Sequence, residues 1–290
     1  MDIKKLVLGT AQFGMDYGIN NKRGRIPKDE VYSILNECIE KGIDTLDTAY
    51  IYGESEFVIG NFIKDSGYGF KIISKLPMCS PIEVKDIFNS SIARLNVDTL
   101  YGYKIHDFKV YEKNSQIWEI LEALKSDGMI NKIGFSLYFP HELEFLLNKN
   151  LKIDIIQIPY NIFDQRFEKY FGFLKKNNIE IYVRSVFLQG LFYKDISELN
   201  IYFSQIKNKI ESLRALSKKT DIPIVSLCLN FATLNNFIDK IIVGIDCVEN
   251  LRDIIDSFVY SLMVENLLDE LYAFREEDES ILIPSKWPKE

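Results

Sequence analysis

The sequence predicts a (β/α)8 barrel formed by a single domain. Eight short apolar segments recur along the chain, and the intervals between them leave room for helices. No Pro/Gly/Ser-rich linker or low-complexity segment divides them. We therefore expect residues 1–290 to form one barrel, with a C-terminal helix and tail over about 258–290.

Each expected strand is a short run rich in Val, Ile and Leu, as in a parallel sheet that is buried on both faces. The expected strands are 6–9, 43–46, 70–74, 99–105, 133–135, 154–158, 181–183 and 241–243. The expected helices are 28–41, 84–95, 113–127, 164–177, 198–218 and 248–257. Gly42 directly follows the first of these helices, where a C-terminal glycine is common.

The main alternative is an open, doubly wound sheet that binds a dinucleotide. That fold usually carries Gly-x-Gly-x-x-Gly at its first strand–helix turn. The motif is missing from every turn placed here, so the barrel is the better prediction.

Composition and charge exclude several classes of protein. The net charge of −7 argues against a nucleic-acid-binding surface. No apolar run reaches the roughly 18 residues of a membrane span, and the first residues pass directly into an apolar segment, so we expect a cytoplasmic protein. The four cysteines show no Cys-x-x-Cys spacing and the two histidines form no ligand motif, so we expect reduced thiols and no metal site.

Four side chains with complementary chemistry follow neighbouring strands. Asp47 ends the second strand, and Tyr52 lies five residues further on; Lys75 and His106 leave the third and fourth strands. Active sites of these barrels lie at the carboxyl ends of the strands. We therefore expect the four side chains to meet at the mouth of the barrel.

These four residues are suited to proton donation. A tyrosine is a poor acid near neutral pH, but a neighbouring ammonium favours the phenolate, and a carboxylate keeps that ammonium charged and in place. The expected chain of contacts is Asp47 to Lys75 to Tyr52, with His106 binding a carbonyl oxygen. Each residue taken alone has an ordinary structural explanation, such as a salt bridge or packing, and only their coincidence favours catalysis. His141 is expected to begin a helix and to have no chemical role.

The stretch from Gly42 to Glu56, which contains Asp44-Thr45-x-Asp47-Thr48-Ala49-x-x-Tyr52-Gly53, resembles the aldo-keto reductase family. Ser74-Lys75 and Ile105-His106-Asp107 extend the resemblance, which runs nearly end to end. It implies a (β/α)8 fold, reduction of aldehydes or ketones, and Asp47, Tyr52, Lys75 and His106 as catalytic residues with Tyr52 as general acid. The opening GTAQFGMDYGI resembles a bacterial subgroup linked to surface carbohydrates, which implies a sugar-derived carbonyl substrate.

The family binds a nicotinamide cofactor without a Rossmann fold, and the resemblance implies where this chain would hold it. Ser136 and Gln157 match residues that hold the carboxamide, although Leu137 replaces a frequent asparagine. Arg184 stands where many members have an aromatic ring, and a guanidinium can also stack. The remaining implied cofactor-binding residues are Ser185, Phe187, Leu188 and Gly190 after strand 7, and Gly244, Asn250 and Arg252 after strand 8.

The residues leave the choice between NADPH and NADH open. Members strict for NADPH often carry Lys-Ser after strand 8 and an arginine in the next helix, where this chain has Gly244-Ile245 and Asn250. A helix N-terminus and Arg252 can attract a phosphate, whereas Asp246 suits a free 2′-hydroxyl. The family resemblance favours NADP(H) over NAD(H), with dual use expected.

Two alternative functions remain open beside the reductase. One is a cofactor-binding regulatory or sensor subunit with little turnover, since the family includes channel β-subunits. The other is a Schiff-base lyase using Lys75, which its pairing with Asp47 disfavours. The substrate itself is not predicted; the loops 12–27, 107–113 and 138–140 and the tail after 275 are expected to bind it, with Tyr17, Phe108, Tyr138 and Trp287 as candidate residues.

Overall fold

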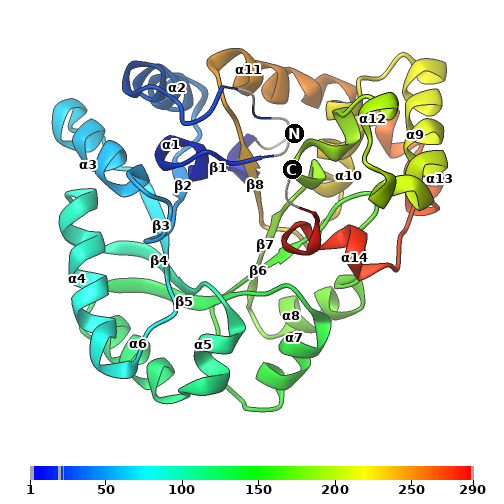
Figure 1. Ribbon diagram of the computed structural model, residues 1–290. Coiled ribbons are helices and arrows are strands. Elements are labelled where there is room, and N and C mark those ends of the chain that lie inside the picture. The colour runs from blue at the N-terminus through cyan, green and yellow to red at the C-terminus, as the bar shows by residue number, and fades with distance from the viewer. Residues whose placement is uncertain (1–2, 19–20, 22, 289–290) are drawn as a thin grey trace.

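The computed structural model describes residues 3–18, 21 and 23–288, and its centre is a closed barrel of eight parallel strands in sequence order (Figure 1). The predicted (β/α)8 fold is confirmed. The strands are β1 Leu6–Gly9, β2 Thr45–Asp47, β3 Lys71–Leu76, β4 Leu100–Ile105, β5 Ile130–Ser136, β6 Ile155–Pro159, β7 Glu180–Arg184 and β8 Lys240–Gly244. Strand β8 pairs with β1 through Leu6 and Ile241, which closes the barrel.

Two apolar layers hold the fold together. A small cluster of Val7, Ile73, Ile155, Tyr182 and Ile242 fills part of the barrel interior. Successive side chains of a strand point to opposite faces, so the neighbours of these residues pack outward against the helices in a much larger buried cluster. Both faces of the sheet are therefore covered, as the apolar strands predicted.

Helices surround the barrel (Figure 1). Those of the outer layer are α2 Lys28–Lys41, α3 Ser55–Ser66, α4 Val84–Leu95, α5 Phe108–Lys113, α6 Gln116–Ser126, α7 Pro140–Leu147, α8 Phe171–Lys176, α9 Lys207–Thr220, α10 Ile224–Thr233 and α11 Val248–Asp256. The predictions for α2 and α4 match residue for residue, and Gly42 ends α2 in the left-handed conformation, with φ +75°.

Three expected helices differ from the structure. Of the segment 113–127, Gln116–Ser126 forms α6, whereas Lys113 is the last residue of a separate helix, α5. In 164–177 only Phe171–Lys176 is α-helical, after a single 3-10 turn. The first part of 198–218 forms 3-10 turns before α9.

A short helix and a turn make an unusually close contact at the start of the chain. Helix α1, Ala11–Gly14, lies against the turn that follows β2. A β-carbon on Gly14 would come within 1.8 Å of the Tyr52 carbonyl oxygen and 2.3 Å of the Ser55 nitrogen. Only glycine fits there, and this contact fixes the turn that carries Tyr52.

The segment after α11 forms α12 Ser261–Glu265, α13 Leu268–Tyr272 and α14 Glu279–Leu282, with 3-10 turns before and after them. Trp287 is buried, donates to the Ile281 carbonyl at 2.9 Å and packs edge-on against Phe203. Arg166 binds Glu279 at 3.1 Å. The tail is therefore attached to the segments that follow β6 and β7, and α14 lies near these strands in Figure 1.

Candidate active site

The four predicted catalytic residues meet at one end of the barrel. Asp47 is the last residue of β2, Lys75 lies in β3 one residue before its end, and His106 directly follows β4. Tyr52 lies in the turn between β2 and α3. Asp47 and Lys75 are almost completely buried, at 3% and 1% exposure, whereas Tyr52 and His106 are partly exposed.

Lys75 joins Asp47 to Tyr52. Its ammonium donates a short hydrogen bond to Asp47 Oδ1, and donates to the Thr48 carbonyl at 2.8 Å and to the Tyr52 hydroxyl at 3.3 Å. The predicted chain of contacts from carboxylate to ammonium to phenol is present.

Burial disfavours the charged forms of Asp47 and Lys75, but the charged groups beside them outweigh this effect. Burial alone would raise the pKa of Asp47, but the ammonium groups of Lys104 and Lys75 lower it to about 2. Burial would likewise favour the neutral form of Lys75, but Asp47 and the Tyr52 hydroxyl hold the pKa of Lys75 above its usual value. Lys75 is therefore an ammonium near neutral pH, which argues against a Schiff-base nucleophile at this position.

His106 lies beside Tyr52 as a neutral imidazole. The two rings meet edge-on, with 5.7 Å between their centroids. Burial, together with the charge of Lys75, lowers the pKa of His106 to about 3. Its Nδ1 is buried and has no hydrogen-bond partner within the described residues. His141 begins α7 at its second residue, as predicted.

Sequence reasoning missed Lys104, a second lysine at this site. It lies in β4 two residues before His106, is completely buried, and its ammonium is 2.6 Å from Asp47 Oδ2. A lysine within an apolar strand, two positions before a candidate catalytic residue, points to the same face of the sheet. That alternation was the signal available in the sequence.

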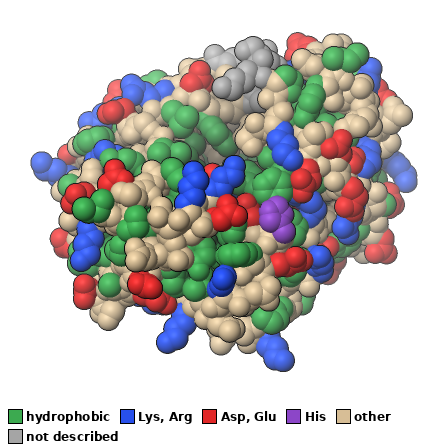
Figure 2. Space-filling model, turned by 60° about the horizontal axis from the view of Figure 1, so that its bottom comes forward, with side chains coloured by type: hydrophobic (Ala, Val, Ile, Leu, Met, Phe, Trp, Pro, Cys, Tyr) green, Lys and Arg blue, Asp and Glu red, His purple; other side chains and the backbone are tan. Residues whose placement is uncertain are grey.

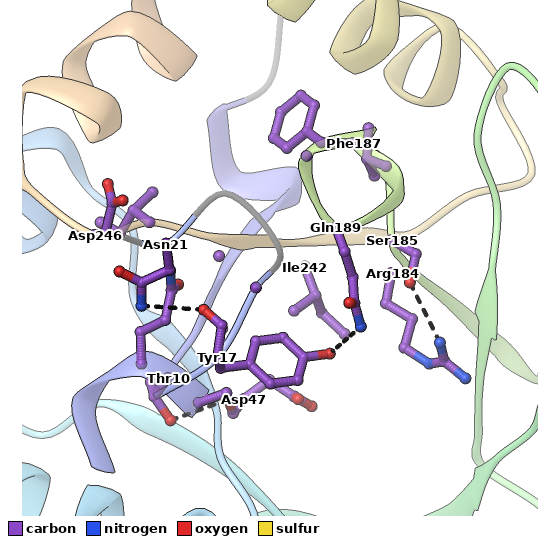
Figure 3. Close-up of a pocket in the computed structure, with 18 of the residues that line it drawn as sticks. Thr10, Tyr17, Asn21, Asp47, Arg184, Ser185, Phe187, Gln189, Ile242 and Asp246 are labelled. Atoms are coloured by element: carbon purple, nitrogen blue, oxygen red, sulfur yellow. Dashed lines mark hydrogen bonds between the residues drawn. The ribbon is translucent and has the colours of Figure 1, made fainter. Parts of the chain in front are cut away.

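A cavity of about 530 Å³ lies at this end of the barrel and contains Asp47, Tyr52 and His106 in its wall. Tyr17 from the loop after β1 and Gln189 from the loop after β7 approach one another across it (Figure 3), with Gln189 Nε2 donating to the Tyr17 hydroxyl at 3.0 Å. The loop after β1 also reaches β8, because Arg23 donates to the Asp246 carbonyl at 3.1 Å. Segments from opposite ends of the chain thus enclose the cavity.

Most residues implied as cofactor-binding line this cavity. They are Ser136, Gln157, Arg184, Ser185, Phe187, Gly190, Gly244 and Asn250. Gln157 donates from Nε2 to Asp47 Oδ2 at 3.0 Å, while its Oε1 is buried without a partner in the described chain. A buried acceptor of this kind suits an amide N–H donor, such as the carboxamide of a nicotinamide.

The turn after β7 has a strained backbone. Ser185, Leu188 and Gln189 have positive φ angles of +61°, +45° and +51°, followed by Gly190 at +91°. Such conformations are unfavourable for residues with a side chain and often accompany binding sites. They place Ser185, Phe187 and Gln189 around the cavity (Figure 3).

Two of the implied cofactor-binding residues are not in the cavity wall. Leu188 is completely buried in the apolar core. Arg252 forms a two-point ion pair with Glu37 of α2, with Nε–Oε1 at 3.1 Å and Nη2–Oε2 at 2.8 Å. This pairing, between residues far apart in the sequence, takes the arginine away from the position expected for a phosphate ligand.

Arg184 packs against protein rather than standing free. Its guanidinium lies 4.1 Å from the Tyr138 ring centroid and donates to the Leu137 carbonyl at 3.0 Å and to Ser185 Oγ at 3.3 Å. Among the candidate substrate-binding residues, Tyr17 and Tyr138 line the cavity, whereas Phe108 packs on Phe145. Trp287 packs in the tail.

Three further observations concern the surface, metal-binding side chains and helix length. On the face shown in Figure 2, acidic and basic side chains alternate with apolar ones, without a continuous basic area. Within the described ranges, no cluster of three or more His, Cys, Asp or Glu could hold a metal ion. No helix in the same ranges has the length and apolarity needed to cross a membrane.

A family model described as "Aldo/keto reductase family" matches residues 5–273, and this chain belongs to that family. An uncharacterized oxidoreductase, YqkF of Bacillus subtilis, is 22% identical over 96% of this chain and 94% of its own. Two solved structures share the fold: aldo-keto reductase AKR11C1 of Bacillus halodurans (TM-score 0.74, 22% identity, 91% of each chain) and glycerol dehydrogenase AKR11B4 of Gluconobacter oxydans (TM-score 0.74, 18% identity, 94% of each chain). The resemblance found in the sequence is confirmed.

Proposed function

We propose that this protein reduces an aldehyde or ketone to an alcohol with a nicotinamide cofactor, and that Tyr52 is the general acid. The observation that carries the proposal is the buried chain of contacts from Asp47 through Lys75 to the Tyr52 hydroxyl, in the wall of a cavity large enough for a ligand. Membership of the family supports an oxidoreductase.

Each residue has a distinct task in this mechanism. A bound nicotinamide supplies the hydride, and Gln157 and Ser136 would hold its carboxamide. His106, as a neutral imidazole, hydrogen-bonds the carbonyl oxygen and orients the substrate. Tyr52 donates its proton to that oxygen as negative charge develops there, and Lys75 stabilises the resulting phenolate. Asp47 keeps Lys75 charged and in place.

We further propose that the enzyme accepts both NADPH and NADH. The family resemblance favours NADPH, but of the groups in this chain expected to attract its phosphate, the helix amides and Arg252, the arginine is paired with Glu37. Asp246 and Asp253 line the cavity beyond β8. A carboxylate suits a free ribose hydroxyl and repels a phosphate, so a strong preference for NADPH is not expected.

The test is turnover by the purified protein. Small aldehydes and sugars are screened with NADPH and with NADH, and consumption of the reduced cofactor is followed by its fluorescence. Tyr52→Phe is expected to bind the cofactor normally and to lose about 10²–10⁴ in rate, the usual contribution of a general acid.

The matched control is Tyr50→Phe, which removes a hydroxyl two residues away. The ring of Tyr50 packs 4.2 Å from the Arg94 guanidinium, and phenylalanine keeps that contact. Near-normal turnover by Tyr52→Phe would contradict the assignment. Tight cofactor binding with no turnover of any carbonyl would instead favour the regulatory or sensor subunit.

A further inference from the structure

The catalytic cluster contains one more charge than the proposed mechanism uses. Lys104 is completely buried in β4, and its ammonium lies 2.6 Å from Asp47 Oδ2. Lys75 binds the other oxygen of the same carboxylate. Asp47 therefore compensates two lysines, and with both protonated the buried cluster carries a net charge of +1.

Lys75 has more hydrogen-bond acceptors than Lys104. Lys75 donates to three acceptors, which belong to Asp47, Thr48 and Tyr52. Lys104 has a single hydrogen-bond acceptor among the described residues, Asp47 Oδ2, and must share it with Gln157. A buried ammonium with unused donors is costly, so Lys104 releases its proton more easily than Lys75.

The balance of the groups around Lys104 also favours release of its proton. Facing it are Asp47 on β2, Lys75 on β3 and, on β7, Arg184 and Tyr182, whose ring centroid is 5.7 Å away. Burial lowers the pKa of Lys104 to about 7, since Asp47 only partly opposes burial and the charges of Lys75 and Arg184. The cluster therefore changes from +1 to neutral close to physiological pH.

We propose that Lys104 is a positioning residue of the reduction that acts through Asp47, and that its proton supplies an additional positive charge which speeds the step. The inference rests on the proposed function. As the carbonyl carbon accepts the hydride, the electron pair of the C=O bond moves to the oxygen, and a preorganised positive charge in a buried site stabilises the negative charge that develops there. Reduction is therefore faster when Lys104 is protonated and slows as the pH rises through neutrality.

The kinetic experiment compares kcat from pH 5.5 to 9 in the wild type and in Lys104→Met. In the wild type kcat falls about tenfold around pH 7, the size of effect expected for one unit charge acting over roughly 10 Å at an effective dielectric constant near 20. In Lys104→Met this step is absent, kcat stays at the lower level, and KM for the cofactor is unchanged. Lys71→Met is the matched control, because Lys71 lies at the start of β3 in a half-exposed pair with Asp44.

A second experiment needs no turnover. With lysine labelled at ¹³Cε and tyrosine at ¹³Cζ, the Lys104 resonance should titrate near pH 7, and the Tyr52 resonance should show an inflection at the same pH. The Tyr52 inflection should vanish in Lys104→Met.

The outcomes separate the two proposals. A Lys104 resonance that titrates only above pH 10, a Tyr52 resonance without the inflection, or an unchanged pH–rate profile in Lys104→Met overturns the role of Lys104. A wild type that reduces no carbonyl overturns the proposed function, and the two resonances then decide whether Lys104 acts on Tyr52. If Lys104→Met does not fold, the wild-type titration decides alone.

Discussion

Replacing Asp47 by asparagine removes the carboxylate that compensates two buried ammonium groups. The amide keeps the shape of the side chain but leaves Lys75 and Lys104 facing each other without a counter-charge. Breaking a buried ion pair by removing one partner costs about 3–5 kcal/mol. At about 2–4 °C per kcal/mol for a chain somewhat smaller than this one, the melting temperature should fall by about 10 °C at pH 7.

The loss of stability in Asp47→Asn should also depend on pH, and its direction can be worked out. Without Asp47, Lys104 needs a lower pH to bind its proton than in the wild type, where its pKa is about 7. Below pH 7 the folded wild type therefore takes up a proton that the folded variant does not. Stability falls toward lower pH wherever the unfolded state binds more protons, so the gap between the two proteins widens from pH 8 to pH 6.

The assay is thermal unfolding followed by circular dichroism at pH 6, 7 and 8. Asp44→Asn is the matched control, since Asp44 forms a half-exposed pair with Lys71 and should contribute less than about 1 kcal/mol. Combining Asp47→Asn with Lys104→Met removes one of the opposed ammoniums and should recover part of the loss. A gap that narrows toward pH 6, or a double variant no more stable than Asp47→Asn, would refute the reasoning.

The remaining predictions concern the turn that carries Tyr52, the ammonium group of Lys75 and the choice of cofactor. Gly14→Ala should lower kcat at least tenfold, because its β-carbon would displace the turn that carries Tyr52; normal kcat with an intact fold would contradict this. Lys75→Met should abolish reduction or move the onset of activity to higher pH, and an unchanged pH–rate profile would show that Lys75 does not act on Tyr52. Dissociation constants for NADPH and NADH, measured by fluorescence titration, should lie within about two decades, and Arg252→Ala should change neither; a four-decade preference would reveal a phosphate site elsewhere.

The residues of the candidate site could be predicted because they depend on local pattern. Asp47 and His106 stand where apolar strands end, and parallel strands bring such residues to one end of the barrel. Lys104 follows from the same alternation, although its position inside the expected strand 99–105 gives no separate sign of a site. Arg252 could not be placed, since its partner Glu37 lies on a distant helix and no spacing in the sequence indicates that ion pair.

The helices likewise divide into those that a local sequence pattern predicts and those that depend on packing in the fold. Helix α2 has a polar face and a terminal glycine, and its bounds were predicted correctly. Helix α10 was missed, because its residues from Ser226 to Thr233 are all buried and show no polar face at the helical period. The segment 113–127 has a helical pattern throughout, but the backbone of Asn114 is not helical, with φ −145° and ψ 82°, and α6 begins only at Gln116.

Closure of the barrel by β1 and β8 has a consequence for how the chain folds during synthesis. The residues of the ionic cluster, Asp47, Lys75 and Lys104, leave the ribosome early, but β8 can pair with β1 only after Gly244 has emerged. Contacts this distant in sequence form slowly, and incomplete sheets expose edges on which chains aggregate. Slower translation or lower temperature during expression should therefore raise the yield of folded protein, and variants that weaken β8 should aggregate more than variants that weaken α4.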